Sequence, residues 1–176
     1  FHRKQIYEDE EGKFFADNDE RAIFFARGIL ETVKKLRWKP DVIHCNGWIS
    51  YLVPLFLKKA YKNDPIFTDA KVVVSLYNEY LQETLDPDMK NKISMQGIKS
   101  KDLELLTEPT GTRLAKIALQ YADGVIRGVE TVDPELEEYI SSLNLPILDY
   151  VDPTDPSGEY LDKYNEFYDK ILDDIQ

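Results

Sequence analysis

The segment KVVVSLY, residues 71–77, constrains the fold more than any other part of this sequence. Apolar and β-branched residues occupy both of its alternating faces, which is the pattern of a strand covered on both sides. Strands of this kind belong to parallel sheets that carry helices on their two faces. The sequence therefore predicts an α/β protein built around this strand.

Helical and strand-like segments alternate on either side of it, as a parallel sheet requires. After the capping residues Asp17, Asn18 and Asp19, apolar residues recur every three or four positions, which predicts a helix of about 18 residues. DVIHC (41–45) and GVIRGV (124–129) are predicted strands, and LPILDY (145–150) is a fourth strand or an extended segment. Further helices are expected over residues 48–62, 112–123, 131–143 and 160–175. The expected architecture is a three-layer, Rossmann-like parallel sheet.

Proline and capping residues refine these boundaries. Pro54 is tolerated in the 48–62 helix only within its first turn or at a kink. Asp133 is the expected cap of the 131–143 helix, with Pro134 at its first position. Residues 78–111 are polar and irregular and are expected to carry one or two short helices. Residues 1–150 are thus predicted to form one domain, and residues 151–176 a linker and a helix that packs back on it.

Composition narrows the classes of function. A chain of 176 residues is long enough to bury a core of its own, and its single cysteine, Cys45, cannot form a disulfide within the chain. The net charge of −11 repels phosphate backbones and anionic lipid headgroups, so neither nucleic acid nor a membrane is an expected partner. The longest apolar run, YLVPLFL, is far shorter than a membrane span. These features are typical of a cytoplasmic protein.

Motifs that bind a phosphate or a metal ion are missing from the sequence. It contains no glycine loop of the Walker or dinucleotide type, no HExxH and no CxxC. Only two histidines are present, so no histidine cluster can form. The acidic clusters at 8–12, 17–20 and 133–138 are better explained as solvated surface than as metal ligands or general acids. No cofactor and no metal are expected.

The segment KPDVIHCNGWISYLVP, residues 39–54, gathers polar groups where a predicted strand ends. In an open α/β sheet, ligands bind at the carboxyl ends of the strands, so His44 is either a ligand contact or a structural histidine bonded to a loop. The structural role is the more common one. A similar choice applies to the terminal helix, where Tyr160, Tyr164, Phe167 and Ile171 share one face. A packed face is more common there than a sugar-stacking or partner surface.

Four ordered blocks give the chain a specific resemblance. DNDERAIFFARGILE, WKPDVIHCNGWISYLVPLFLK, VVVSLYN and LAKIALQYADGVIRGVE resemble, in order and spacing, the conserved segments of the bacterial glycogen synthase and starch synthase family. The resemblance covers roughly residues 1–140. It implies the later two-thirds of the amino-terminal domain of a GT-B glycosyltransferase, with the first strands missing upstream of Phe1 and the second domain absent. That family transfers glucose from ADP-glucose to an α-glucan with retention of configuration.

The family pattern assigns candidate site residues by position. His44, Trp48 and Asn78 match family residues, Asn46 is an accepted alternative, and Gln82 lies in the same segment. The resemblance therefore implies a substrate-binding role for His44, Asn46, Trp48, Asn78 and Gln82.

Two positions depart from the family where it has functional residues. Gly47 replaces an aspartate, and Tyr77 replaces the histidine that lies against the transferred glucose. A glycine cannot supply the carboxylate that would stabilise positive charge in the transition state, and a tyrosine is a poor base near neutral pH. We therefore expect a glycogen synthase-like glycosyltransferase domain that is inactive or very weak as this chain. The alternative is a non-catalytic relative that binds glucan or regulates an authentic synthase.

Overall fold

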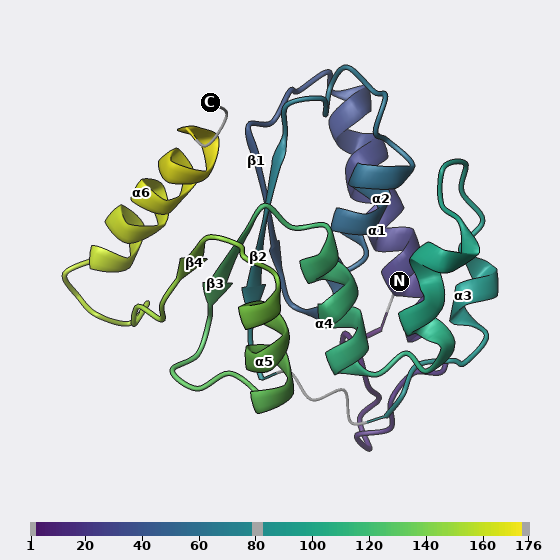
Figure 1. Cartoon of the computed structure of the whole chain (residues 1–176). Helices are drawn as coiled ribbons and strands as arrows, with labels where there is room; N and C mark the ends of the chain where they lie inside the picture. The colour runs from purple at the N-terminus through teal and green to yellow at the C-terminus, as the bar shows by residue number, and fades with distance from the viewer. Residues whose placement is uncertain (1–2, 79–82, 174–176) are drawn as a thin grey trace.

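The computed structural model describes residues 3–78 and 83–173, and within them it contains a four-stranded parallel sheet (Figure 1). The strands are β1 (Val42–Asn46), β2 (Lys71–Leu76), β3 (Gly124–Arg127) and β4 (Ile147–Leu148), and they lie in sequence order across the sheet. All three pairings are parallel, with Asn46 opposite Ser75 and Ser75 opposite Ile126. The predicted α/β parallel sheet is confirmed.

Most helices cover one face of this sheet. They are α1 (Asn18–Lys35), α2 (Val53–Lys59), α3 (Met89–Lys92), α4 (Gly111–Gln120) and α5 (Pro134–Ser142), with the 3₁₀ helices η1 (Trp48–Ser50) and η2 (Ser100–Thr107) between them. The other face carries α6 (Glu159–Asp173), the helix drawn in yellow in Figure 1. The sheet therefore lies between two helical layers, as the sequence predicts.

The hydrophobic core also consists of two parts, one on each face of the sheet. Side chains such as Val72, Val74 and Leu76 alternate along β2 toward the larger helical layer and join the main hydrophobic cluster. Val73 of β2 and Ile126 of β3 point the other way and form a separate small cluster with Phe167 and Ile171 of α6. The sheet is thus buried on both sides, which explains the apolar pattern on both faces of β2.

Two local expectations need correction. Residues 48–62 are not one helix: η1 and a turn come first, and α2 begins only at Val53, with Pro54 in its first turn where a missing N–H removes no helical bond. Asp17 stands at the start of α1, but its carboxylate makes no capping bond and instead pairs with Arg3 at 2.7 Å. The other cap is as predicted, because Asp133 accepts a hydrogen bond from the backbone N–H of Glu135.

No helix within the described ranges combines the length and the apolarity needed to cross a membrane.

Candidate functional site

The carboxyl edge of the sheet brings several predicted site residues together. Asn46 ends β1, Tyr77 follows β2, and the Tyr77 hydroxyl donates a hydrogen bond of 3.2 Å to Asn46 Oδ1. Asn78 comes next and is anchored by two bonds, donating to the carbonyl of Thr131 at 2.7 Å and accepting from the N–H of Asp133 at 3.0 Å. The side chains of Asn46 and Tyr77 thus form one polar edge, braced by Asn78 against the start of α5.

Gly47 connects β1 to η1 with a backbone conformation that only glycine adopts readily. Its φ is 77° and its ψ is 155°, a combination that other residues reach only with strain. The carbonyl of Gly47 accepts a hydrogen bond from Ser50 Oγ at 2.8 Å, which fixes the turn. The glycine is therefore a structural requirement of this turn as well as a departure from the aspartate of the family pattern.

Replacing Gly47 with alanine is expected to lower the free energy of unfolding by about 1–3 kcal/mol, the usual cost of forcing such a backbone conformation on a residue with a Cβ. Urea denaturation of the parent protein and of Gly47→Ala measures this difference in the free energy of unfolding. Gly28→Ala is the matched control, because Gly28 lies inside α1 with open space around its Cβ position, so alanine there is not destabilising. If Gly47→Ala were as stable as the parent protein, the backbone strain expected for a residue with a Cβ at position 47 would be contradicted.

His44 makes contacts with the protein through both of its ring nitrogens. Nε2 lies 2.7 Å from Ser75 Oγ on β2, and Nδ1 lies 2.7 Å from the hydroxyl of Tyr168 on α6. The ring also packs against Tyr164, with centroids 5.9 Å apart. Burial lowers the pKa of His44 to about 4, so the imidazole is neutral at physiological pH. These contacts match the structural role that the sequence left open beside a ligand contact.

Trp48 is placed in the core. Its side chain is 4% exposed, and its indole lies 4.9 Å from the ring of Tyr7 and 6.2 Å from that of Phe14. It positions the turn after β1 by packing. The remaining predicted residue, Gln82, lies outside the described residues.

Gly128 makes room for Tyr77. A Cβ at Gly128 would lie 2.4 Å from Cε1 of Tyr77, so the tyrosine ring rests directly on the glycine backbone. Beside it, Tyr77, Asn78 and Asp133 line a cavity of about 30 Å³, which holds no more than a water molecule or two. The tyrosine and its glycine partner therefore close space that a smaller side chain would leave open.

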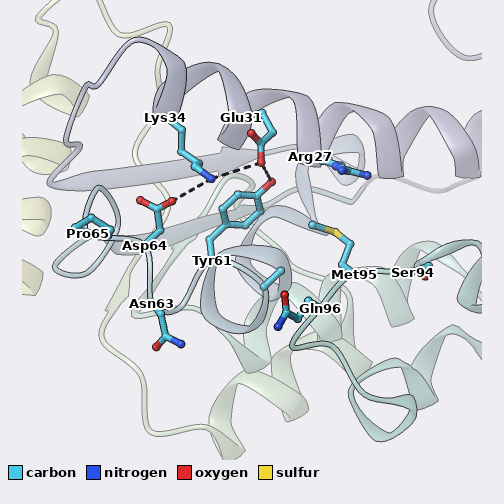
Figure 2. A pocket seen from close by; sticks show the side chains of 11 residues that line it. Arg27, Glu31, Lys34, Tyr61, Asn63, Asp64, Pro65, Ser94, Met95 and Gln96 are labelled. Atoms are coloured by element: carbon cyan, nitrogen blue, oxygen red, sulfur yellow. Dashed lines mark hydrogen bonds and ion pairs between the residues drawn. The ribbon is translucent and has the colours of Figure 1, made fainter.

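A larger hollow of about 550 Å³ lies elsewhere, between α1 and the loop that follows α2 (Figure 2). Charged side chains that line the hollow pair with one another. Lys34 Nζ lies 3.1 Å from Asp64 Oδ2 and 3.8 Å from Glu31 Oε1. Tyr61 donates a 2.6 Å hydrogen bond to Glu31. Burial and the neighbouring Glu31 raise the pKa of Tyr61. This hollow shares no residue with the polar carboxyl edge.

Part of the edge escaped the sequence analysis. The sequence predicts a packed face for Tyr164, with a sugar-stacking or partner surface as the alternative, and does not single out Tyr168. Nothing in the local pattern connects either tyrosine with His44, more than 100 positions away. Gly128 likewise carries no motif of its own. Among the described residues, no cluster of three or more histidine, cysteine or carboxylate side chains is arranged to hold a metal ion.

Residues 1–144 match the family described as starch synthase catalytic domain. The chain therefore belongs to the starch synthase catalytic-domain family, in agreement with the resemblance that its four sequence blocks carry.

Two individual relatives support this family assignment. Glycogen synthase from Clostridium perfringens is 31% identical over 140 residues, covering 78% of this chain and 27% of that protein. Glycogen synthase from Chlorobium limicola is 38% identical over 101 residues, covering 57% of this chain and 21% of that protein. The chain thus spans about a quarter of the length of these curated relatives.

A solved structure shares the fold. The catalytic domain of starch synthase IV from Arabidopsis thaliana, bound to ADP and acarbose, superposes with a TM-score of 0.59 and 20% sequence identity. The match covers 88% of this chain and 34% of that chain. The four-stranded sheet and its helices are accordingly those of a GT-B glycosyltransferase domain.

Proposed function

We propose that this chain binds α-glucan at the carboxyl edge of its sheet and that, as this chain, it transfers glucose from ADP-glucose very weakly or not at all. The observation that carries the proposal is the pairing of Asn46 with Tyr77 next to Gly47. The edge keeps hydrogen-bonding groups suited to a sugar, while the two positions at which the family has an aspartate and a histidine have neither side chain.

The chemistry of the edge supports weak catalysis. Glycosyl transfer develops positive charge on the glucosyl carbon, and a carboxylate at position 47 would stabilise that charge in a site shielded from water. Gly47 supplies none. Tyr77 points its hydroxyl at Asn46 and rests on Gly128, so its ring occupies the neighbourhood in which a smaller imidazole would leave space.

The proposal also covers the kind of organism, the cell compartment and the partner of the protein. Bacterial glycogen synthases among the relatives suggest a bacterial, cytoplasmic protein of glycogen metabolism. Residues 1–150 would act as one synthase-type domain, with residues 151–176 as linker and packed helix. The strongly negative charge favours a neutral polysaccharide over nucleic acid as the partner.

Glucose turnover tests the catalytic half of the proposal. The expected result is no measurable transfer from radiolabelled ADP-glucose to glycogen by the protein, and none by Gly47→Asp combined with Tyr77→His. The double variant stays inactive because aspartate strains the turn and histidine leaves a gap above Gly128. Robust turnover by the unmodified protein would overturn the proposal of weak catalysis.

Glycogen co-sedimentation tests the binding half. The protein is expected to pellet with glycogen, and Asn46→Ala is expected to weaken the association several-fold, because Asn46 is exposed at the edge and accepts the hydrogen bond of Tyr77. Asn63→Ala, in the hollow beside α1, is the control that keeps normal binding. A parent protein that stays in the supernatant would contradict glucan binding.

A further inference from the structure

Helix α6 runs antiparallel to the strands, which brings its first turns to the carboxyl edge of the sheet. Near its end, Ile171 and Phe167 lie over Gly124, the first residue of β3, because a Cβ there would come within 2.2 Å and 3.1 Å of them. Tyr168, between them in the sequence, bonds to His44 in β1, and one turn back Tyr164 packs against the same imidazole ring. In Figure 1, α6 lies on the opposite side of the strands from the other helices and runs upward, whereas the strand arrows point downward. Its amino-terminal half therefore points to the edge that holds Asn46 and Tyr77.

Four tyrosines from three separate segments lie at this edge. Tyr160 and Tyr164 of α6 form an edge-to-face pair with ring centroids 6.0 Å apart. Tyr77 comes directly after β2 and Tyr150 comes two residues after β4, so both stand at this edge of the parallel sheet. Burial raises the pKa of Tyr164, and Tyr77, Tyr160 and Tyr150 raise it further. We call Tyr77, Tyr150, Tyr160 and Tyr164 the tyrosine wall. All four side chains are partly exposed.

Contacts with His44 and with the sheet hold the tyrosine wall rigid. Tyr164 and Tyr168 are a second edge-to-face pair at 6.3 Å, and the hydroxyl of Tyr168 is fixed by His44 Nδ1. Phe167 and Ile171 are buried against Val73 and Ile126, which sets the register of α6 on the sheet. Aromatic side chains immobilised before binding lose little entropy when a ligand arrives, so such a surface is suited to recognition.

We propose that the tyrosine wall is the stacking surface for α-glucan at the carboxyl edge, supplied in part by α6. This inference rests on the proposed glucan-binding function and names the residues that give it its ligand class. The C–H faces of pyranose rings pack on the electron-rich faces of aromatic rings, and phenol hydroxyls donate to sugar oxygens. Burial raises the pKa of Tyr164, so its hydroxyl stays protonated and able to donate at neutral pH. An uncharged sugar chain also approaches a protein of net charge −11 without repulsion.

Tyr160 is the residue to substitute first, because its hydroxyl makes no hydrogen bond within the described part of the chain and its loss disturbs little packing. Titration of the protein with maltoheptaose is expected to give about tenfold weaker binding for Tyr160→Ala, the order expected for one stacked ring. Tyr160→Phe keeps the ring and is expected to bind within about twofold of the parent protein. Leu161→Ala, on the exposed side of the same helix, is the matched control with unchanged affinity.

A second variant removes the helix without touching any tyrosine. Gly124→Val places a branched side chain where even a Cβ collides with Ile171, so α6 is expected to leave the sheet. The expected result is loss of maltoheptaose binding together with rapid proteolysis inside residues 151–173, while the protein remains folded by circular dichroism. Binding that survives the release of α6 would overturn the inference.

The outcomes separate this inference from the proposed function. If the parent protein binds maltoheptaose, Asn46→Ala weakens binding and Tyr160→Ala does not, the tyrosine wall is refuted and glucan binding at the edge stands. If Tyr160→Ala and Tyr160→Phe lose affinity equally, the ring is not the recognised group and the stacking surface is refuted. If the parent protein binds neither maltoheptaose nor glycogen, both proposals fall.

Discussion

Replacing Lys92 with methionine is expected to lower the free energy of unfolding by about 3–5 kcal/mol, the typical cost of leaving a buried charge without its partner. Asp19, at the start of α1, is 0% exposed, and Lys92 Nζ lies 2.7 Å from its Oδ2. Its other oxygen, Oδ1, has no hydrogen-bond partner within the described residues. Without the ammonium group of Lys92, the carboxylate would be buried with little compensation. Urea denaturation monitored by fluorescence gives the difference.

Asp86 provides the control for this prediction. It also contacts Lys92 Nζ, at 2.9 Å, but its side chain is 39% exposed and remains hydrated without the lysine. Asp86→Asn is therefore expected to cost less than about 1 kcal/mol. Combining Asp19→Asn with Lys92→Met should recover much of the lost stability, because the charge that needs a partner is gone. A Lys92→Met protein as stable as its parent would contradict the buried pair.

Elements with a strong periodic pattern were predictable from sequence. α1 and β2 were placed close to their observed bounds, because each buries a clear apolar pattern in the shared core. The 48–62 segment was mispredicted as one helix, since its apolar residues satisfy helical periodicity, yet a turn fixed by Ser50 intervenes before Pro54 can enter α2.

The carboxyl edge was predictable only in part. Asn46 and Tyr77 follow neighbouring parallel strands, so their meeting follows from the topology once the strands are placed. The sequence left a sugar-stacking face on the terminal helix open only as the less common alternative, because its pattern does not show which face of the sheet the helix packs against. Only the structure shows that Gly124 leaves space for Ile171 and that Tyr168 reaches His44.

Acidification is expected to destabilise the protein through His44, beginning well above the range in which carboxylates titrate. Burial lowers the pKa of His44 from its ordinary 6.5 to about 4, so the unfolded chain takes up this proton first as the pH falls. The stability that the neutral imidazole contributes is complete above pH 6.5 and is lost progressively between pH 6.5 and 4. A pKa difference of this size corresponds to about 3 kcal/mol.

Comparison with a His44→Gln variant separates the titration of His44 from that of the carboxylates. Asp17, Asp86, Asp102 and Glu137 have lowered pKa values and lose their own contributions as the pH falls toward 4 and below. His44→Gln keeps these groups and removes only the imidazole. The stability of the parent protein minus that of His44→Gln should therefore fall by about 3 kcal/mol between pH 7 and 4. A His44 ring that titrates near pH 6.5 by nuclear magnetic resonance would show that α6 does not shield it from water.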